Sequence, residues 1–462
     1  MKKKIDLVNE DIFKTLFKLS LPILGTSFIQ MAYSMVDMIW VGKIGSGALA
    51  AIGTAGFFSW FGSSLVLVTK TGAEVGVSQS IGKGNDKEKN KYIYNSLYGC
   101  ITLSIIYTIL LIVFNKQLIG FFNLGDKEII KMSIDYLIII SIGMVSTFLN
   151  PQFTGIMTAT GNSKSPFIIN TIGLVLNLIL DPILIFGIDG IKPLGVVGAA
   201  LATVISQVIV TAIFICIFIR YGIRINLKNI KFIDSDIMKK IIKWRTPTAL
   251  QNCLFSVFGM IIGRMIATFG PTPIAVQKVG SQIESLSWMT AGGFSSALTA
   301  FIGQNYGAGR SDRVIEGYKK TLMMSSILGI LATVLLVFFG QPLFKIFSSE
   351  QEVIKQGGEY LKILGYSQIF MCIEITTAGA YFGLGRTLAP SLISIIFTGL
   401  RIPAAMILSN SNLLGLNGVW WSISMSSVFK GVILISMFIF IVVIPMRRKY
   451  NKIVVSKVGR VN

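Results

Sequence analysis

Two carboxylates interrupt apolar stretches in the first half of the chain, and each lies near other oxygen-bearing side chains. Asp37 follows Gln30 and Tyr33 at spacings of seven and four residues, which place the three side chains on one face of a helix. Asn177 precedes Asp181 by one helical turn, so the amide and the carboxylate also face one way. Ionisable residues are costly inside a membrane, so these acids are candidates for a functional site.

These side chains have the chemistry of a small cation site. Thr203, in a further apolar stretch, would add a hydroxyl to the two carboxylates and the amide oxygen. Such an oxygen set suits Na⁺, and paired carboxylates in a low-dielectric site would also hold a proton. The residues alone leave the choice between Na⁺ and H⁺ open. Upstream, Pro22 predicts a kink that frees a backbone carbonyl.

The elements that must position these residues are membrane-spanning helices. Of the 462 residues, 53% are hydrophobic and only 14% are charged. About twelve apolar stretches are each long enough to cross roughly 30 Å of hydrocarbon, and we therefore expect an all-α membrane protein. The expected spans are 15–40, 48–78, 92–115, 129–156, 166–187, 195–219, 241–268, 274–303, 318–340, 357–383, 390–410 and 418–445.

The basic residues indicate how the spans are oriented. The formal net charge is +21, and Lys and Arg gather in alternate connections, at both ends and in a long central segment. This distribution follows the positive-inside rule and predicts a multi-pass protein of the cell membrane with both termini cytoplasmic. The charge therefore reflects contact with the lipid bilayer, and we expect no nucleic-acid partner.

The two halves of the chain repeat one pattern. Pro22 corresponds to Pro247 and Gly84 to Gly309 at one constant offset, and Gly195 corresponds to Gly415 after a small shift. Six spans per half give both halves the same orientation, related by a pseudo-twofold axis along the membrane normal. We expect an N-terminal six-helix lobe (1–219), a basic cytoplasmic linker (220–240), a C-terminal six-helix lobe (241–445) and a basic tail (446–462).

The repeat separates residues that the fold needs from residues that serve a function. The second-half equivalents of the four oxygen ligands carry none of the same groups; they are Ile262, Arg401, Ala405 and Ile423. A cation site is therefore predicted in the N-terminal lobe. The C-terminal lobe carries its own intramembrane charges, which we expect to form a buried charge network; these are Arg264, Glu284, Glu374 and Arg401.

An enzyme is not indicated. The chain contains no His, which excludes an HExxH zinc site and a Ser–His triad, and no GxGD motif accompanies the intramembrane acids. Its four Cys lie within apolar spans and form no CxxC pair. We expect no cofactor beyond a coupling ion.

Together, four motifs resemble those of the MATE family, the multidrug and toxic compound extrusion transporters. They are LSLP (19–22), VDMIWVG (36–42), NLILDP (177–182) and GQNYGAG (303–309), and the resemblance extends along the whole chain. The resemblance implies twelve helices in two lobes. It also implies alternating access, with export of amphipathic, usually cationic, compounds in exchange for Na⁺ or H⁺.

The resemblance also assigns roles to residues. The family's N-lobe cation site falls on Asp37, Asn177, Asp181 and Thr203. Gln30 and Tyr33 match positions that line the N-lobe cavity, and Pro22 matches a proline whose bend is linked to proton-driven change. One departure is that the expected seventh helix has no acid and carries Arg264 instead. Whether the C-lobe acids bind ion or substrate is left open.

A flippase of lipid-linked precursors, from the related superfamily, is the alternative. It would need cations in a central cleft, which Lys70, Arg264, Lys278 and Arg401 could supply. Asp37 and the Asn177–Asp181 pair favour an antiporter of small organic cations, which we expect to be a monomer. The sequence does not identify the natural substrate.

Overall fold

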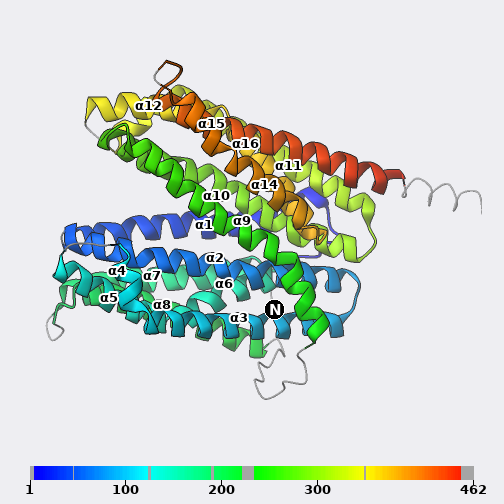
Figure 1. Cartoon of the computed structure of the whole chain (residues 1–462). Coiled ribbons are helices and arrows are strands. Elements are labelled where there is room, and N and C mark those ends of the chain that lie inside the picture. The colour runs from blue at the N-terminus through cyan, green and yellow to red at the C-terminus, as the bar shows by residue number, and fades with distance from the viewer. Residues whose placement is uncertain are drawn as a thin grey trace, which may run out of the picture. The chain divides into compact units, whose positions relative to one another are not determined.

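The computed structural model describes residues 5–448, except 45, 123–125, 189–191, 221–233, 348–349 and 411. Its elements are helices, and the described residues contain no β-strand (Figure 1). In chain order they are α1 (Ile12–Gly42), α2 (Ser46–Gly82), α3 (Asp86–Val113), α4 (Asn115–Gly120), α5 (Lys127–Ile142), α6 (Met144–Ala159), α7 (Lys164–Phe186), α8 (Val196–Arg220), α9 (Ser235–Ala267), α10 (Pro271–Gly307), α11 (Ser311–Lys345), α12 (Gln351–Gly365), α13 (Gln368–Gly383), α14 (Leu388–Gly399), α15 (Arg401–Leu408), α16 (Leu416–Phe438) and the π-helical turn η2 (Ile439–Val443).

The helices have the lengths that a membrane protein requires. Within the described residues, nine helical spans are long and apolar enough to cross a membrane, and the pair α5–α6, bent by 48°, makes a tenth. Helix α10 and the pair α12–α13 occupy the places of the eighth and tenth predicted spans. The prediction of an all-α membrane protein with about twelve spans is therefore confirmed.

The chain divides into two compact units. The first contains Gly25–Ser80 and Asn85–Arg245, and the second contains Ile5–Leu24, Ile81–Gly84 and the chain from Thr246 onward. The first half of α1 thus belongs to the second unit. Most of the predicted linker, residues 221–233, lies outside the described residues, so the predicted lobe boundaries stay predictions.

In the first unit, α8 packs against α5, α6 and α7, and α3 packs against α6. Phe153 of α6 anchors this packing, because its ring stacks on Phe214 and lies 4.7 Å from the ring of Phe218, both of α8. The α7–α8 contact is the most important for the site, because these two helices carry three of its predicted residues.

In the second unit, α10, α11, α13 and α16 pack around one apolar core. The rings of Tyr318, Tyr381 and Phe438 meet there, and Leu16 and Leu19 of α1 join the same cluster. On α11, by contrast, Phe338 is 74% exposed, as expected for a side chain that contacts lipid.

The backbone repeats between the two halves as the sequence pattern predicts. Gly84 and Gly309 have φ angles of 68° and 73°, and Gly195 and Gly415 have 55° and 54°. These angles lie in the left-handed region, which glycine adopts without a steric penalty. The matched turns confirm the predicted register of the repeat.

A second pair of glycines repeats a close contact between helices. A Cβ atom on Gly198 would lie 2.3 Å from the carbonyl oxygen of Leu184, and one on Gly418 would lie 2.1 Å from that of Leu408. The same approach of backbone to backbone therefore holds α7 to α8 and α15 to α16. This contact fixes which residues of the two halves are equivalent around it.

Candidate functional site

The predicted amide–carboxylate pair is formed in α7. The Asn177 side-chain Nδ2 donates a hydrogen bond of 2.9 Å to Oδ1 of Asp181, which confirms that the two side chains share one helical face. Asn177 is 2% exposed and Asp181 is fully buried. A buried polar pair of this kind needs hydrogen bonds to offset its lost hydration. The bond therefore fixes the orientation of the Asn177 amide.

Because the amide nitrogen of Asn177 donates to Asp181, the amide oxygen of Asn177 is available for another partner. The Asn177 Oδ1 atom is buried, and it has no hydrogen-bond partner among the described residues. Buried polar atoms without a partner are uncommon, and each calls for a ligand, a water molecule or an ion. Asn177 Oδ1 is thus an acceptor to which a small cation could bind.

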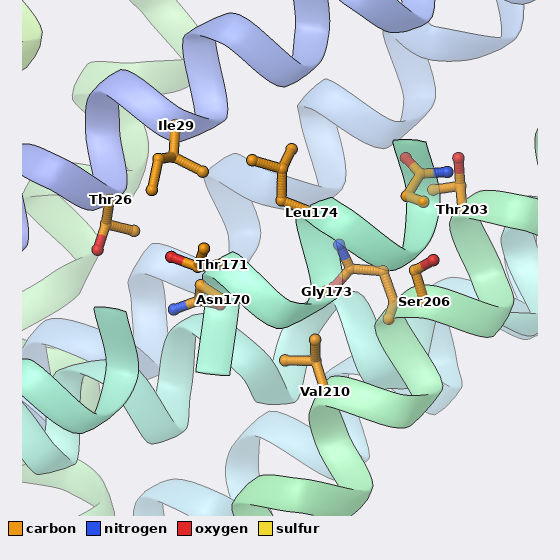
Figure 2. Close-up of a pocket in the computed structure, with 11 residues that line it drawn as sticks. Thr26, Ile29, Asn170, Thr171, Gly173, Leu174, Thr203, Ser206 and Val210 are labelled. Carbon is orange, nitrogen blue, oxygen red and sulfur yellow. The ribbon is translucent and has the colours of Figure 1, made fainter. Parts of the chain in front are cut away.

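A small cavity adjoins this amide. Its volume is about 70 Å³, and Figure 2 shows that residues of α1, α7 and α8 surround it. The lining residues are Thr26, Ile29, Asn170, Thr171, Gly173, Leu174, Asn177, Thr203, Ser206, Gln207 and Val210. Drug-sized ligands occupy pockets of about 300–1,000 Å³, so this cavity suits a partly hydrated ion or a few water molecules.

Thr203 reaches the cavity from α8, as the sequence predicts, and Ser206 lies one turn further along the same helix. Asp181 does not line the cavity. It is hydrogen-bonded to Asn177, which does line the cavity. The structure thus brings Asn177, Asp181 and Thr203 together. Asn177 and Thr203 line the cavity, and Asp181 does not.

The side chains of Gln30, Tyr33 and Asp37 lie outside the described residues, although all three belong to α1. Their convergence on the cavity stays a prediction. Thr26 lines the cavity and precedes Gln30 by one helical turn, so it shares the face that carries Gln30, Tyr33 and Asp37.

Pro22 lies inside α1, which runs continuously from Ile12 to Gly42. Thr26, Ser206 and Gln207 were not predicted as site residues. The signal that could have found Thr26 is its hydroxyl on the helical face of Asp37. For Ser206 and Gln207 it is their positions one turn beyond Thr203 on α8.

The C-lobe charges lie in the second unit and have internal partners. Glu374 of α13 forms an ion pair with Lys430 of α16, with 3.0 Å between Oε2 and Nζ. Arg401, the first residue of α15, donates hydrogen bonds to the hydroxyls of Ser426 and Ser427. These contacts join three helices of one lobe through polar side chains.

Glu284 of α10 belongs to the same neighbourhood. Its carboxylate accepts hydrogen bonds of 3.1 Å from the Tyr360 hydroxyl and 2.8 Å from the Gln368 amide, and it interacts electrostatically with Arg401. Arg264 is exposed, and it forms no ion pair within the described part of the chain. The charge network therefore includes Lys430, which was not assigned to it, and the structure does not show Arg264 in it.

Two repeated bundles of apolar helices, with a polar cavity inside the first, define a multi-pass membrane protein. The MatE family model matches residues 22–183 and 247–407, one match in each half of the chain. These matches cover most of the sequence, and the chain belongs to the MATE family.

Two curated relatives and one solved structure illustrate the likeness. A probable multidrug resistance protein NorM from Thermotoga maritima is 28% identical, with 93% of this chain and 92% of the relative covered. A FAD transporter from Shewanella oneidensis is 26% identical, with 94% and 95% covered. A crystal structure of a MATE protein in the bent conformation has a TM-score of 0.87 at 23% identity, with 97% and 99% covered.

Proposed function

We propose that this protein is a secondary antiporter that exports amphipathic organic cations in exchange for Na⁺ or H⁺ by alternating access. The observation that carries the proposal is the buried Asn177–Asp181 pair beside a small polar cavity in the N-terminal half. A relative with a similar sequence is named as a probable multidrug resistance protein, which agrees with drugs or metabolites as cargo.

Exchange follows from competition for negative charge. Asp37 and Asp181 would repel each other when both are ionised in a low-dielectric site. A coupling ion or a proton that enters from outside relieves this repulsion, and a cationic substrate relieves it as well. Each occupant therefore displaces the other, and release of the ion to the inside prepares the acids for the next substrate.

The cavity separates the roles of ion and drug. At about 70 Å³ it admits Na⁺ with part of its hydration shell, or a hydronium ion, and it is too small for a drug. Asn177 Oδ1 and the Thr203 hydroxyl would supply neutral oxygens to the ion, while Asp181 holds the amide in place. Gln30 and Tyr33 would contact the larger substrate, and the bend at Pro22 would couple ion binding to movement of α1.

The orientation in the cell membrane is part of the proposal. The distribution of Lys and Arg supports cytoplasmic termini, and the protein would act as a monomer. Single cysteines placed at Lys87 and Lys91 should resist a membrane-impermeant thiol reagent added to intact cells. Labelling of these positions from outside would contradict the topology.

The decisive experiment measures transport in proteoliposomes with an imposed Na⁺ or H⁺ gradient and ethidium as the cargo. Asp181→Asn should fold, because the amide is nearly isosteric, and should lose gradient-driven transport. Asp236→Asn, a change at an exposed acid in the first turn of α9, is the matched control and should keep full activity. Full gradient-driven transport in an Asp37→Asn, Asp181→Asn double variant would contradict the proposal.

A flippase of lipid-linked precursors is the competing proposal, and it would have to rely on Arg264 and Lys278, which are exposed, because the other two candidate cations have internal partners. Lys70 lies 3.8 Å from Glu74, one turn along α2, and Arg401 is engaged by two serine hydroxyls. Cations that already have internal partners are less available to an anionic headgroup. Transport of an anionic lipid in the proteoliposomes, together with no transport of ethidium, would favour the flippase.

A further inference from the structure

In the C-terminal half, basic side chains occupy positions that are equivalent to residues lining the cavity of the N-terminal half. The contacts Gly198–Leu184 and Gly418–Leu408 set the register of this comparison. Four residues that line the cavity, Asn177, Ser206, Gln207 and Val210, correspond to Arg401, Ser426, Ser427 and Lys430. Two neutral positions of the N-terminal half are thus occupied by basic side chains in the C-terminal half.

These two cations are bound to groups of their own lobe. Lys430 is 7% exposed and Glu374 is 12% exposed, and their charged atoms lie 3.0 Å apart. Arg401 donates to the hydroxyls of Ser426 and Ser427, which are the counterparts of cavity-lining residues. Arg401 also interacts electrostatically with Glu374 and Glu284.

The charges of this cluster balance. Two acids, Glu284 and Glu374, face two bases, Arg401 and Lys430, so the formal charges of the four side chains sum to zero. Desolvation makes an uncompensated buried charge costly, so Glu374 depends on Lys430 staying in place. Glu284, by contrast, also has hydrogen bonds from Tyr360 and Gln368. A soluble cation would have to displace the ammonium group of Lys430 from Glu374. Because this ammonium is covalently attached to the chain, it gains no translational entropy when it is displaced.

We propose that Lys430 is a tethered cation that occupies the carboxylate of Glu374, so that this acid is closed to a soluble cation and exchange is confined to the N-terminal lobe. This inference rests on the proposed antiport function and deepens it. It gives the protein one exchangeable cation site per chain and makes Lys430 a determinant of the charge of the cargo. Removal of its ammonium group would open a second cation site at Glu374.

The first test measures binding of radiolabelled ethylammonium, which resembles the end of a lysine side chain, to the purified full-length protein. Lys430→Ala should gain one saturable site relative to wild type. The site should disappear in Glu374→Gln, Lys430→Ala and persist in Asp181→Asn, Lys430→Ala. No added site in Lys430→Ala, or a site that persists without Glu374, would overturn the inference.

The second test measures a property that a merely structural ion pair would not alter. In proteoliposomes, Lys430→Gln should raise the transport of propidium, a dication, relative to ethidium, a monocation, on the order of tenfold, because one more carboxylate is available. Glu374→Gln, Lys430→Gln should restore the wild-type ratio. Lys355→Gln, a change at an exposed lysine of α12, should leave the ratio unchanged. An equal loss for both dyes in Lys430→Gln would overturn the inference.

A stability measurement covers the case in which the single Lys430 variants do not fold. Glu374→Gln, Lys430→Met removes both charges and should unfold at a higher temperature than Glu374→Gln alone. Additive losses would show that the two side chains do not interact and would overturn the inference. The outcomes also separate the two proposals, because a wild-type protein that exports no ethidium contradicts the antiport function, whereas the ethylammonium result depends on Glu374 and Lys430 alone.

Discussion

The amide of Asn177 donates to the carboxylate of Asp181 over 2.9 Å, and this bond turns the amide oxygen of Asn177 away from the acid. Asn177 lines the cavity, whereas Asp181 does not. On the proposed function, the acid would act on the cavity in two ways, by its charge and by holding the amide of Asn177 in place. The two effects can be separated by mutation.

Asn177→Ala should keep the charge of the site and remove one neutral oxygen. We expect the apparent affinity for the coupling ion to fall about tenfold, as for loss of one hydrogen bond to a charged group. The maximum rate at saturating ion should stay near that of wild type. Ethidium transport as a function of ion concentration measures both quantities. Complete loss of transport at every ion concentration would show that Asn177 does more than bind the ion.

The close helix contacts at Gly198 and Gly418 should not tolerate a side chain. A Cβ atom at either position would lie within 2.3 Å of a backbone carbonyl oxygen, which the helix cannot move without shifting its neighbour. We expect Gly198→Ala and Gly418→Ala to destabilise the protein by about 1–3 kcal/mol each. Thermal unfolding in detergent measures the loss. Gly259→Ala of α9, where a Cβ atom would meet nothing within 4 Å, is the control, and equal losses at all three glycines would contradict the contact geometry.

Local patterns in the sequence predict the parts of this site that lie within one helix. The four-residue spacing of Asn177 and Asp181 is enough to place them on one face, and the paired glycines are enough to reveal the repeat. Both follow from helix periodicity and backbone conformation, which depend on neighbouring residues.

Contacts between helices could not be predicted in this way. Glu374 and Lys430 are distant in the sequence, and they meet because α13 packs on α16. The sequence indicates that Glu374 and Lys430 would each be costly in lipid without a partner of opposite charge. Many pairings of the intramembrane acids and bases would meet this requirement. Arg264 of α9 was predicted to belong to the charge network, but its side chain is exposed.

Glu374 should matter for stability more than for coupling. Glu374→Gln leaves the ammonium of Lys430 buried without its counter-charge, and the expected cost is about 3–5 kcal/mol. Protein that does fold should keep its dependence on the Na⁺ or H⁺ gradient, because the proposed coupling acids, Asp37 and Asp181, are in the other lobe. Unfolding midpoints and gradient-driven ethidium transport, compared with Asp181→Asn, measure the two effects. Loss of ion dependence in well-folded Glu374→Gln would move the coupling site to the C-terminal lobe.

Asp234, just before α9, should give the first unit an acid-sensitive contact. A hydrogen bond from Lys91, at 3.0 Å, lowers the pKa of the Asp234 carboxyl below its ordinary value. A lowered pKa in the folded state stabilises above the unfolded pKa, and the contribution disappears as the pH falls through the folded pKa. We therefore expect the protection of the amide hydrogens at the start of α9, measured relative to their intrinsic exchange rates, to fall below about pH 4. Asp234→Asn should show this lower protection at neutral pH as well, and identical protection at every pH in the two proteins would contradict the role of this contact.

The repeat makes it possible to place a basic residue of the C-terminal lobe at the equivalent position of the N-terminal lobe. Asn177 and Arg401 are equivalent positions, so Asn177→Arg would introduce a tethered cation beside Asp181, as Lys430 is placed beside Glu374. The guanidinium would compete with the soluble ion for the N-lobe acids at every ion concentration, because it is covalently attached beside them. We therefore expect gradient-driven transport to fall roughly a hundredfold while the protein remains folded, which corresponds to about 3 kcal/mol. Asn177→Gln, which lengthens the side chain without adding charge, should retain more transport than Asn177→Arg. Transport of ethidium under an imposed gradient and the unfolding temperature are measured for both variants. If Asn177→Arg transports as well as Asn177→Gln, the acids of the N-terminal lobe are not the place where the ion exchanges.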